Sequence, residues 1–296
     1  MRYETKEIAY RLLYPVETDD HLPTPLKNKV GFARRCDRYG LRHARTLFVF
    51  EDSVPADAKL PAIDLFLKPV RGKGGEGAER WTFIGDERYS DGEGRVLTAD
   101  GLLAHIQDLS RYVEPYIVQP AFRNHPSLSD LSPGALCTAR MLTCCNTIGG
   151  FELTDAAFRM PANARSAVDN FHAGGIASSV DVTTAKLGPA TDLGTRGGMI
   201  WYENHPYTGA TIVGRSLPMW RDAVALVERA HGVFGDYALV GWDVAFLDEG
   251  PALIEGNRGP DIDIHQRTRR GPIGNGRFGA LLAHNLERRS ELHEDV

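Results

Sequence analysis

Residues 240–257 constrain the fold more than any other segment, because their alternation of apolar and polar residues predicts an antiparallel β-hairpin. In the first strand, apolar side chains at every second position alternate with Asp243, so Asp243 lies on the face opposite the core. A three-residue loop, 248–250, ends in a glycine, which suits the left-handed backbone that such loops need. This loop pairs residue 247 with 251 and therefore places Asp243 directly opposite Glu255 on the second strand.

The predicted pair of carboxylates needs a positive charge between its members. Two carboxylates about 4 Å apart repel by roughly 4 kcal/mol at an effective dielectric constant near 20, and like charges opposite each other destabilise a hairpin. Asn257 lies on the same face as Glu255 and adds an amide oxygen. Asp243, Glu255 and Asn257 thus form an all-oxygen set that suits Mg²⁺, with Mn²⁺ as an alternative ion. The other interpretation is a solvated hairpin whose acidic side chains do not meet.

The composition of the chain excludes several classes of protein. Its 296 residues are 42% hydrophobic and 25% charged, which is typical of a globular protein with about two folding units. The net charge of −5 and the lack of a long basic run argue against nucleic acid as a partner. No stretch approaches about 18 uninterrupted apolar residues, so no membrane span is predicted. The four cysteines lack metal-site spacing and indicate reduced thiols in a cytoplasmic protein.

A glycine-rich loop in the first third of the chain lies between two predicted strands. Its glycines fit the GxGxxG pattern, but residues 80–84 alternate like a strand, whereas a dinucleotide-binding loop opens a helix. The loop is therefore predicted to be a flap whose backbone amides close over phosphates, with Lys68 beside it as a point charge. An ordinary hairpin turn is the alternative. The flap glycines are Gly72, Gly74, Gly75 and Gly77.

Periodicity along the rest of the chain predicts a mixture of helices and strands. A proline-bounded connector, 55–61, suits a boundary between units. The predicted helices are 29–39, 102–109, 218–231 and 277–286, and the further predicted strands are 47–50, 63–69, 80–84, 116–119 and 137–145.

The order of the motifs resembles that of the ATP-grasp superfamily. A Lys-Pro pair precedes the glycine loop, followed by a VQPA strand, a strand arginine, an N-x-x-x-GG segment, GWDV and IEGN. The segments YIVQPAFRNHPSLSDLSPGALCTARMLTC, VDNFHAGGIASSVD, HPYTG and VGWDVAFLDEGPALIEGNRGPDID look like the branch of sugar-transfer-associated ATP-grasp proteins, and the resemblance covers about residues 29–286. It implies an α+β, two-lobed ATP-grasp fold with a shortened N-terminal pre-grasp region. The implied units are this region at 1–60, the N-terminal lobe with the flap at 61–121, and the C-terminal lobe with the metal site at 122–296.

The resemblance also implies roles for single residues on the ATP side of the cleft. Asp243, Glu255 and Asn257 resemble the Mg²⁺ ligands of the superfamily, in agreement with the hairpin. Lys68 and, earlier in the chain, Lys29 look like lysines that contact the phosphates of ATP. Arg140 resembles the arginine that stabilises the transferring phosphoryl group. Residues 116–121 resemble the hinge that binds adenine through its backbone, with Tyr116, Ile117, Val118 and Gln119 as the binding residues, and Gln119 departs from the glutamate of many relatives.

Other residues are assigned to the substrate side. Asn170, Gly174 and Gly175 belong to the DN-x-x-x-GG segment, whose glycines allow a ligand close to the backbone; a tight turn is the alternative. Arg258 follows the IEGN motif and is assigned with them. His172 and His205 are acid–base candidates, although a lone histidine is more often structural. Arg267, Arg269 and Arg270 form a basic cluster that fits either a solvated surface or recognition of an anionic substrate.

Members of the superfamily typically activate a carboxylate as an acyl phosphate, which an amine or another nucleophile then attacks. The resemblance implies an ATP-dependent, ADP-forming ligase that joins carboxylates to amines with Mg-ATP and acts on small molecules or peptides. Two alternatives are a phosphotransferase acting on a hydroxyl group and a non-catalytic nucleotide-binding module in a surface-glycan or peptide-modification pathway. The sequence names neither substrate, and it is compatible with a homo-oligomer.

Overall fold

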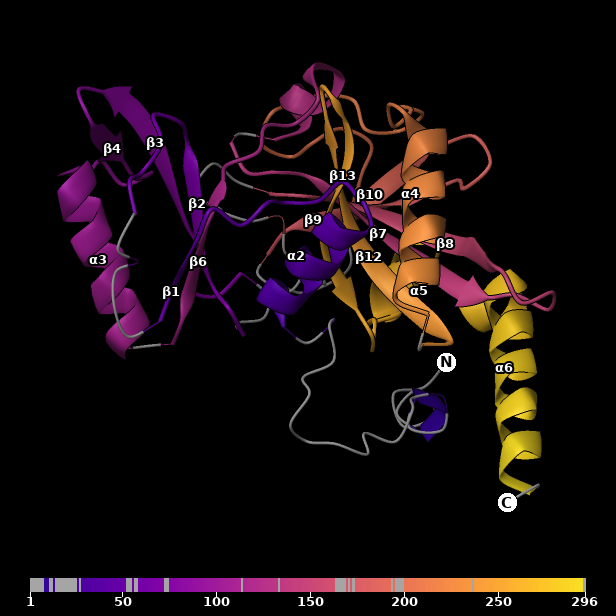
Figure 1. The fold of residues 1–296 in the computed structure, drawn as a ribbon. Coiled ribbons are helices and arrows are strands. Elements are labelled where there is room, and N and C mark those ends of the chain that lie inside the picture. The colour runs from indigo at the N-terminus through magenta and orange to yellow at the C-terminus, as the bar shows by residue number, and fades with distance from the viewer. Residues whose placement is uncertain are drawn as a thin grey trace.

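A computed structural model of the chain shows two β-sheets, each covered by helices, which form two lobes (Figure 1). The structure describes residues 8–10, 13, 26, 28–51, 55, 58–71, 75–112, 114–132, 134–162, 169, 171, 174–192, 194, 200–235 and 237–294. Two sheets, one smaller and one larger, are found within these ranges.

The smaller sheet has the strand order β1-β6-β2-β3-β4-β5 and carries one helix, α3 (Ala99–Tyr112), on its outer face (Figure 1). Alternate residues of β2 and the side chain of Trp81 are buried in one cluster with Ile106 of α3. Since neighbouring residues of a strand face opposite sides, Lys68 of β2 faces the cleft. The strands are β1 (Phe48–Phe50), β2 (Leu65–Pro69), β3 (Glu79–Gly85), β4 (Arg88–Ser90), β5 (Val96–Thr98) and β6 (Tyr116–Pro120).

The larger sheet has the order β11-β10-β9-β8-β7-β12-β13, with α4 on one face and α5 and α6 on the other. Its strands are β7 (Thr138–Cys145), β8 (Phe151–Met160), β9 (Ile176–Val180), β10 (Leu187–Thr191), β11 (Trp201–Tyr202), β12 (Leu239–Leu247) and β13 (Gly250–Asn257). The helices are α4 (Trp220–Val233), α5 (Asp263–Thr268) and α6 (Arg277–Glu294), with short 3₁₀ turns at Pro126–Leu131 and Ile273–Asn275.

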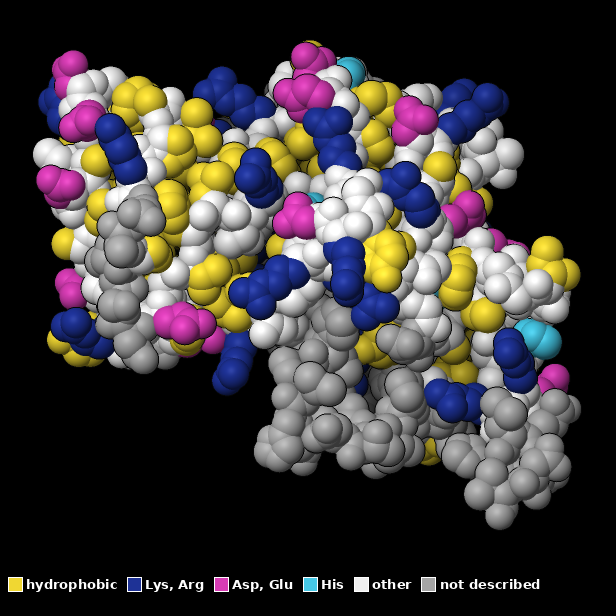
Figure 2. Space-filling model, viewed as in Figure 1, with side chains coloured by type: hydrophobic (Ala, Val, Ile, Leu, Met, Phe, Trp, Pro, Cys, Tyr) yellow, Lys and Arg dark blue, Asp and Glu magenta, His cyan; other side chains and the backbone are white. Residues whose placement is uncertain are grey.

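Helix α2 (Lys29–Arg38) packs on the larger sheet, and Lys29 at its start reaches Val70 of the smaller lobe. Asn28 caps its first turn by accepting hydrogen bonds from two backbone N–H groups, which fixes where the helix begins. Its apolar face, with Phe32 and Cys36, is buried in the core of the larger sheet. Its opposite face lies in the middle of the surface shown in Figure 2, where Lys and Arg side chains gather.

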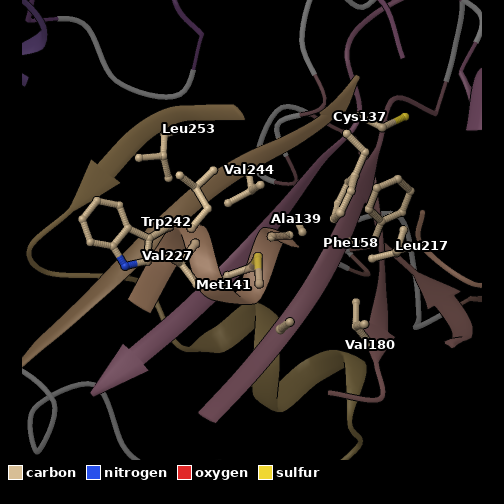
Figure 3. Close-up of a cluster of buried hydrophobic side chains, with 14 of the residues drawn as sticks. Cys137, Ala139, Met141, Phe158, Val180, Leu217, Val227, Trp242, Val244 and Leu253 are labelled. Atoms are coloured by element: carbon tan, nitrogen blue, oxygen red, sulfur yellow. The ribbon is translucent and has the colours of Figure 1, made fainter. Parts of the chain in front are cut away.

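The main core lies between the larger sheet and α4. Figure 3 shows side chains of β7, β8, β12 and α4 pointing into one cluster, among them Met141, Phe158, Val227 and Trp242. These four side chains are fully buried. This packing holds β7 and β12 firmly side by side, and the polar residues on the opposite face of these strands form the floor of the cleft.

Most predicted elements are present, with differences at their ends. The segments β4, β5, β8, β9, β10, β11 and α5 were not predicted, because they are short or mix small and polar residues. Helix α4 begins at Trp220 rather than at Pro218, since Met219 has a left-handed backbone with φ of 47°. The described part of the predicted N-terminal region does not form a unit of its own: β1 joins the smaller sheet, and α2 packs on the larger one.

A buried chain of hydrogen bonds crosses the core beneath α4. Trp242 Nε1 donates to Thr143 Oγ1 at 2.8 Å, and Thr143 Oγ1 lies 2.7 Å from His231 Nδ1. His231 Nε2 lies 2.9 Å from the carbonyl oxygen of Tyr237, which can only accept, so Nε2 carries the proton. The neutral ring thereby satisfies both its nitrogens, and burial lowers the pKa of His231 to about 4.

We predict that the free energy of unfolding falls as the pH is lowered from about 6.5 to about 4. Unfolded His231 takes up a proton at its ordinary pKa, whereas the folded state resists protonation, so the stability is present above this window and lost within it. The shift corresponds to about 3 kcal/mol, and urea denaturation at several pH values measures it. The variant His231→Gln should lose this share of the pH dependence, and His284→Gln on α6 should keep it. An unchanged pH profile in His231→Gln would contradict the assignment.

Candidate functional site

Charged residues from four elements meet in the cleft between the lobes. Lys29, the first residue of α2, donates from Nζ to the carbonyl oxygen of Val70 at 3.2 Å. Burial lowers the pKa of Lys68 to about 8 and also lowers that of Lys29, and in both cases the negative charge of Glu255 is the largest opposing influence. The charge of Asp243 also acts on Lys68. The structure therefore brings these four predicted residues together, two cations facing two carboxylates.

The predicted pairing of Asp243 with Glu255 is confirmed, but the predicted loop is wrong. Leu247 pairs with Gly250, so the connection has two residues and the register differs by one from the predicted one. A β-bulge at Ile254 then adds one residue to β13 and restores the opposite placement. Without the bulge, Glu255 would point to the other face of the sheet, because side chains alternate along a strand.

Arginines, rather than open solvent, surround Asp243. Arg140, its cross-strand partner on β7, donates from Nε to Oδ1 at 2.5 Å and from Nη2 to Oδ2 at 3.2 Å. Arg159 of β8 donates from Nη2 to Oδ2 at 2.8 Å. Burial by itself raises the pKa of this carboxyl group, but the two guanidinium groups outweigh it and hold the pKa well below its usual range. Two fixed cations therefore relieve the repulsion from Glu255 that the sequence analysis assigned to a metal ion.

The ionic contacts continue to the predicted substrate segment through Asp169. Its Oδ2 accepts a hydrogen bond from Thr138 Oγ1 at 2.5 Å and lies 3.6 Å from Arg159 Nε. Arg159 also donates to Thr138 from Nε and Nη2. The result is a buried chain of alternating charges, Asp169–Arg159–Asp243–Arg140, which joins the segment around residue 169 to the hairpin.

The other two predicted metal ligands lie beside each other. Asn257 Nδ2 is 3.2 Å from Glu255 Oε1, and reversing the amide would present oxygens from both side chains. No cluster of three or more His, Cys, Asp or Glu side chains suited to a metal ion occurs in the part of the chain that the structure describes. The oxygen donors fit Mg²⁺, with Glu255 and Asn257 as the more available ligands and Asp243 partly occupied by the arginines.

The predicted hinge lies in the middle of the smaller sheet. Tyr116, Ile117 and Val118 are paired with β1 on one side and with β2 on the other, so the ladder occupies their backbone groups. Gln119 pairs only with β2, and its side-chain Nε2 donates to the carbonyl oxygen of Ala44 at 2.8 Å. The prediction that residues 116–118 bind adenine through their backbone does not fit this pairing. On the side of β6 that faces β1, the ladder ends at Val118, so backbone groups on that side are unpaired by the sheet from residue 119 onward.

The predicted flap and substrate residues are described in part. Gly72, Gly74 and Asn170 lie outside the described residues. Gly75 and Gly77 form the turn between β2 and β3, in agreement with the predicted strand–loop–strand arrangement, and both have left-handed backbones. A Cβ on Gly77 would lie 2.8 Å from Tyr116 Oη, so only glycine fits there. Gly174 and Gly175 lead into β9, beside the strand that carries Arg159.

The segment after Asn257 folds back over β12. A Cβ on Gly241 would lie 2.5 Å from Pro260 Cβ, so the glycine of the GWDV motif makes room for this turn. The close approach also brings residues 258–262 near Arg140, because Arg140 Cδ lies 3.3 Å from the position that this Cβ would occupy. Arg258 is half-buried at the start of this turn, next to the predicted metal ligands.

Several acid–base and basic candidates have structural partners. His205 is buried, lies 2.9 Å from the carbonyl oxygen of Pro161, and accepts backbone hydrogen bonds from residues 207 and 208. It therefore organises a turn, while His172 lies outside the described residues. In the predicted basic cluster, Arg269 pairs with Asp155, Arg267 donates to the carbonyl oxygen of Asp192, and Arg270 stacks on Trp201.

The family model for sugar-transfer-associated ATP-grasp proteins matches residues 13–271 of the chain. The chain belongs to this ATP-grasp family. Its structure has the corresponding α+β fold, and membership implies that the protein binds ATP. Comparison with curated protein sequences gives no match.

Solved structures of similar fold are distant in sequence. D-alanyl-alanine synthetase A from Vibrio cholerae is 12% identical, with a TM-score of 0.50, covering 89% of this chain and 65% of that one. An L-amino acid ligase from Bacillus licheniformis is 12% identical, with a TM-score of 0.45 and coverages of 84% and 45%. The ATP-grasp ligase PsnB, complexed with a minimal precursor, is 14% identical, with a TM-score of 0.46 and coverages of 90% and 60%. This chain thus spans less than two thirds of each.

Sequence reasoning missed Arg159 of this ATP-grasp protein. The residue lies at the end of β8, and a signal was present in the alternation of FELTDAAFRM, where Asp155, Ala157 and Arg159 share one face. A prediction of this strand would have placed Arg159 on the cleft face. Ala157 pairs with Arg140 on the neighbouring strand, and Arg159 lies two residues further along on the same face. No helix among the described residues combines the length and the apolar character needed to span a membrane.

We predict that Arg159→Met destabilises the protein by about 3–5 kcal/mol, because it leaves Asp169 and Asp243 buried with one partner fewer. Urea denaturation measures the loss. The double variant Arg159→Met/Asp169→Asn should recover part of it, since the second change removes one of the uncompensated charges. As a control, Arg277→Met breaks an exposed pair with Glu152 and should cost less than about 1 kcal/mol. Equal losses in the two arginine variants would contradict the role given to the buried chain.

Proposed function

We propose that the protein is an ATP-dependent ligase that joins a carboxylate to an amine through an acyl phosphate and uses Mg-ATP. The supporting observation is that Lys29 and Lys68 face Asp243 and Glu255 across the cleft. A nucleoside triphosphate with its divalent cation needs both kinds of group at close quarters, cations for the phosphates and oxygen donors for the metal. Family membership supports the ATP part of the proposal.

The proposed reaction has two steps. A carboxylate oxygen of the first substrate attacks the γ-phosphorus of ATP, which forms an acyl phosphate and releases ADP. The amine then attacks the carbonyl carbon and gives up a proton; the C–N bond forms, and the C–O bond breaks as phosphate leaves. In the first step Lys68, Lys29 and the glycine flap hold the phosphates in line with the attacking oxygen, so that the reacting atoms meet without further loss of translational freedom.

Arg140 is suited to the negative charge that develops on the transferring group. Its contacts with Asp243 use Nε and Nη2, and its Nη1 donates to no described residue. Because Asp243 fixes the guanidinium plane, the free edge is oriented before the substrate arrives. Glu255, Asn257 and Asp243 would hold Mg²⁺, which would supply positive charge against the phosphates.

The first test is isothermal titration of a non-hydrolysable ATP analogue into the protein, with and without Mg²⁺. We expect magnesium-dependent binding to wild type and at least tenfold weaker binding to Glu255→Ala, since the variant lacks one oxygen ligand. Glu249→Ala, at the exposed tip of the same hairpin, is the matched control and should bind as wild type. Absence of binding to wild type with Mg²⁺ would contradict the proposal. Binding would justify screening pairs of carboxylates and amines for ADP release.

We further predict that binding of the ATP analogue near pH 8 is coupled to proton uptake by Lys68. In the free protein burial lowers its pKa to about 8, so part of the population is neutral, and the phosphate charges of the ligand restore the protonated form. Titration in buffers of different ionisation enthalpy measures the uptake. Lys68→Arg keeps the charge at every pH and should abolish the uptake. Equal proton uptake by the variant would contradict the role of Lys68.

A further inference from the structure

The outward face of α2 carries three arginines that the ligase reaction does not use. Arg34 and Arg38 are exposed and recur at helical spacing opposite the buried Phe32 and Cys36, and Arg35 is half-buried at the edge of this face. Residues 29–45 contain six basic residues and one acidic residue, a net charge of +5, in a chain whose net charge is −5. We name Arg34, Arg35 and Arg38 the α2 arginine face.

The α2 arginine face gathers three arginines on one short helix without a counter-ion among the described residues. Arginines of both lobes pair with carboxylates, for example Arg95 with Asp91, Arg215 with Asp130 and Arg277 with Glu152. Among the described residues, no carboxylate forms an ion pair with any arginine of the α2 arginine face. Three like charges within about one helical turn repel one another unless an anion lies between them.

The surroundings hold the face in place without neutralising it. Arg35 lies over the ring of Phe234, with Cζ 5.3 Å from the ring centre. Arg229 of α4 donates to the carbonyl oxygen of Gly40 at 2.8 Å, which adds a fourth arginine at the end of α2. Tyr39 beside them is 53% exposed, an aromatic surface next to the charges. In Figure 2 this region forms part of the band of Lys and Arg side chains across the middle of the molecule.

The chemistry of the face favours a carboxylate-rich partner. A guanidinium group pairs with a carboxylate through two parallel hydrogen bonds. Side chains at i and i+4, such as Arg34 and Arg38, lie about 6 Å apart on a helix, and acidic side chains at the same spacing on a partner helix match them. A membrane surface fits less well, because a membrane-bound helix inserts an apolar face and that of α2 is buried.

We propose that the α2 arginine face docks an acidic helical segment of a partner protein. The segment presents Asp or Glu at i, i+3 and i+4, so that its carboxylates pair with the three guanidinium groups. The opposite end of α2 carries Lys29 in the cleft, nine residues or about 13 Å away along the helix axis, so docking leaves the ATP site open. The proposal stands whether or not the ligase reaction is correct.

The test uses a fluorescein-labelled helical peptide of about 20 residues with glutamates at this spacing on an alanine background, and the same peptide with glutamine in place of glutamate. Fluorescence anisotropy should show binding of the glutamate peptide alone, weakening as salt is added. Arg34→Glu/Arg38→Glu should bind it at least tenfold more weakly. Arg111→Glu/Arg221→Glu makes the same change of charge at exposed helix positions elsewhere and should bind as wild type.

Two further measurements make the result decisive. Thermal denaturation and binding of the ATP analogue should be unchanged in both double variants, which shows that α2 and Lys29 are intact. Vesicles that contain anionic lipid form a separate arm of the experiment. The proposal is overturned if the glutamate peptide does not bind, if the two double variants lose binding equally, or if the face binds vesicles and not the peptide.

Discussion

The site depends on the placement of one buried carboxylate, Asp243, between two guanidinium groups. Arg140 and Arg159 come from neighbouring strands of the same sheet, and their hydrogen bonds fix the carboxylate at 2.5 Å and 2.8 Å. Burial of a single charge would cost several kcal/mol, so none of these groups is stable without the others. Through Arg159 the same contacts hold Asp169, which joins the hairpin to the predicted substrate segment.

This arrangement separates the tasks of the two lobes. The larger sheet supplies a rigid floor, because its other face is packed against α4 in the main core. The smaller sheet supplies Lys68, and α2 supplies Lys29 while packing on the larger sheet. Lys68 thus sits on an element anchored in a different core from the two acids, whereas Lys29 shares the core of the acids. An arrangement of this kind suits a cleft that closes on a charged ligand.

Much of the fold was predictable from local patterns. The alternation in β12 and β13, the glycine turn between β2 and β3, and the amphipathic α2 are properties of short segments, and the structure contains each of them. The hairpin shows the limit of such reasoning. The predicted loop was one residue too long, and the bulge at Ile254 compensates, so that Asp243 and Glu255 still lie opposite each other. Alternation in the sequence reports which side chains share a face but does not report where a ladder slips.

The sequence by itself determined the identity of the chain as an ATP-grasp protein, because that information lies in the ordered motifs and in residue types such as Lys68, Glu255 and Asn257. The tertiary structure decided which charges are neighbours. That Arg159 compensates Asp243, that the ladder occupies the backbone of residues 116–118, and that the α2 arginine face has no counter-ion among the described residues all follow from contacts between distant segments. Electrostatic energies depend on distance and burial in space, and the order of residues along a chain fixes neither.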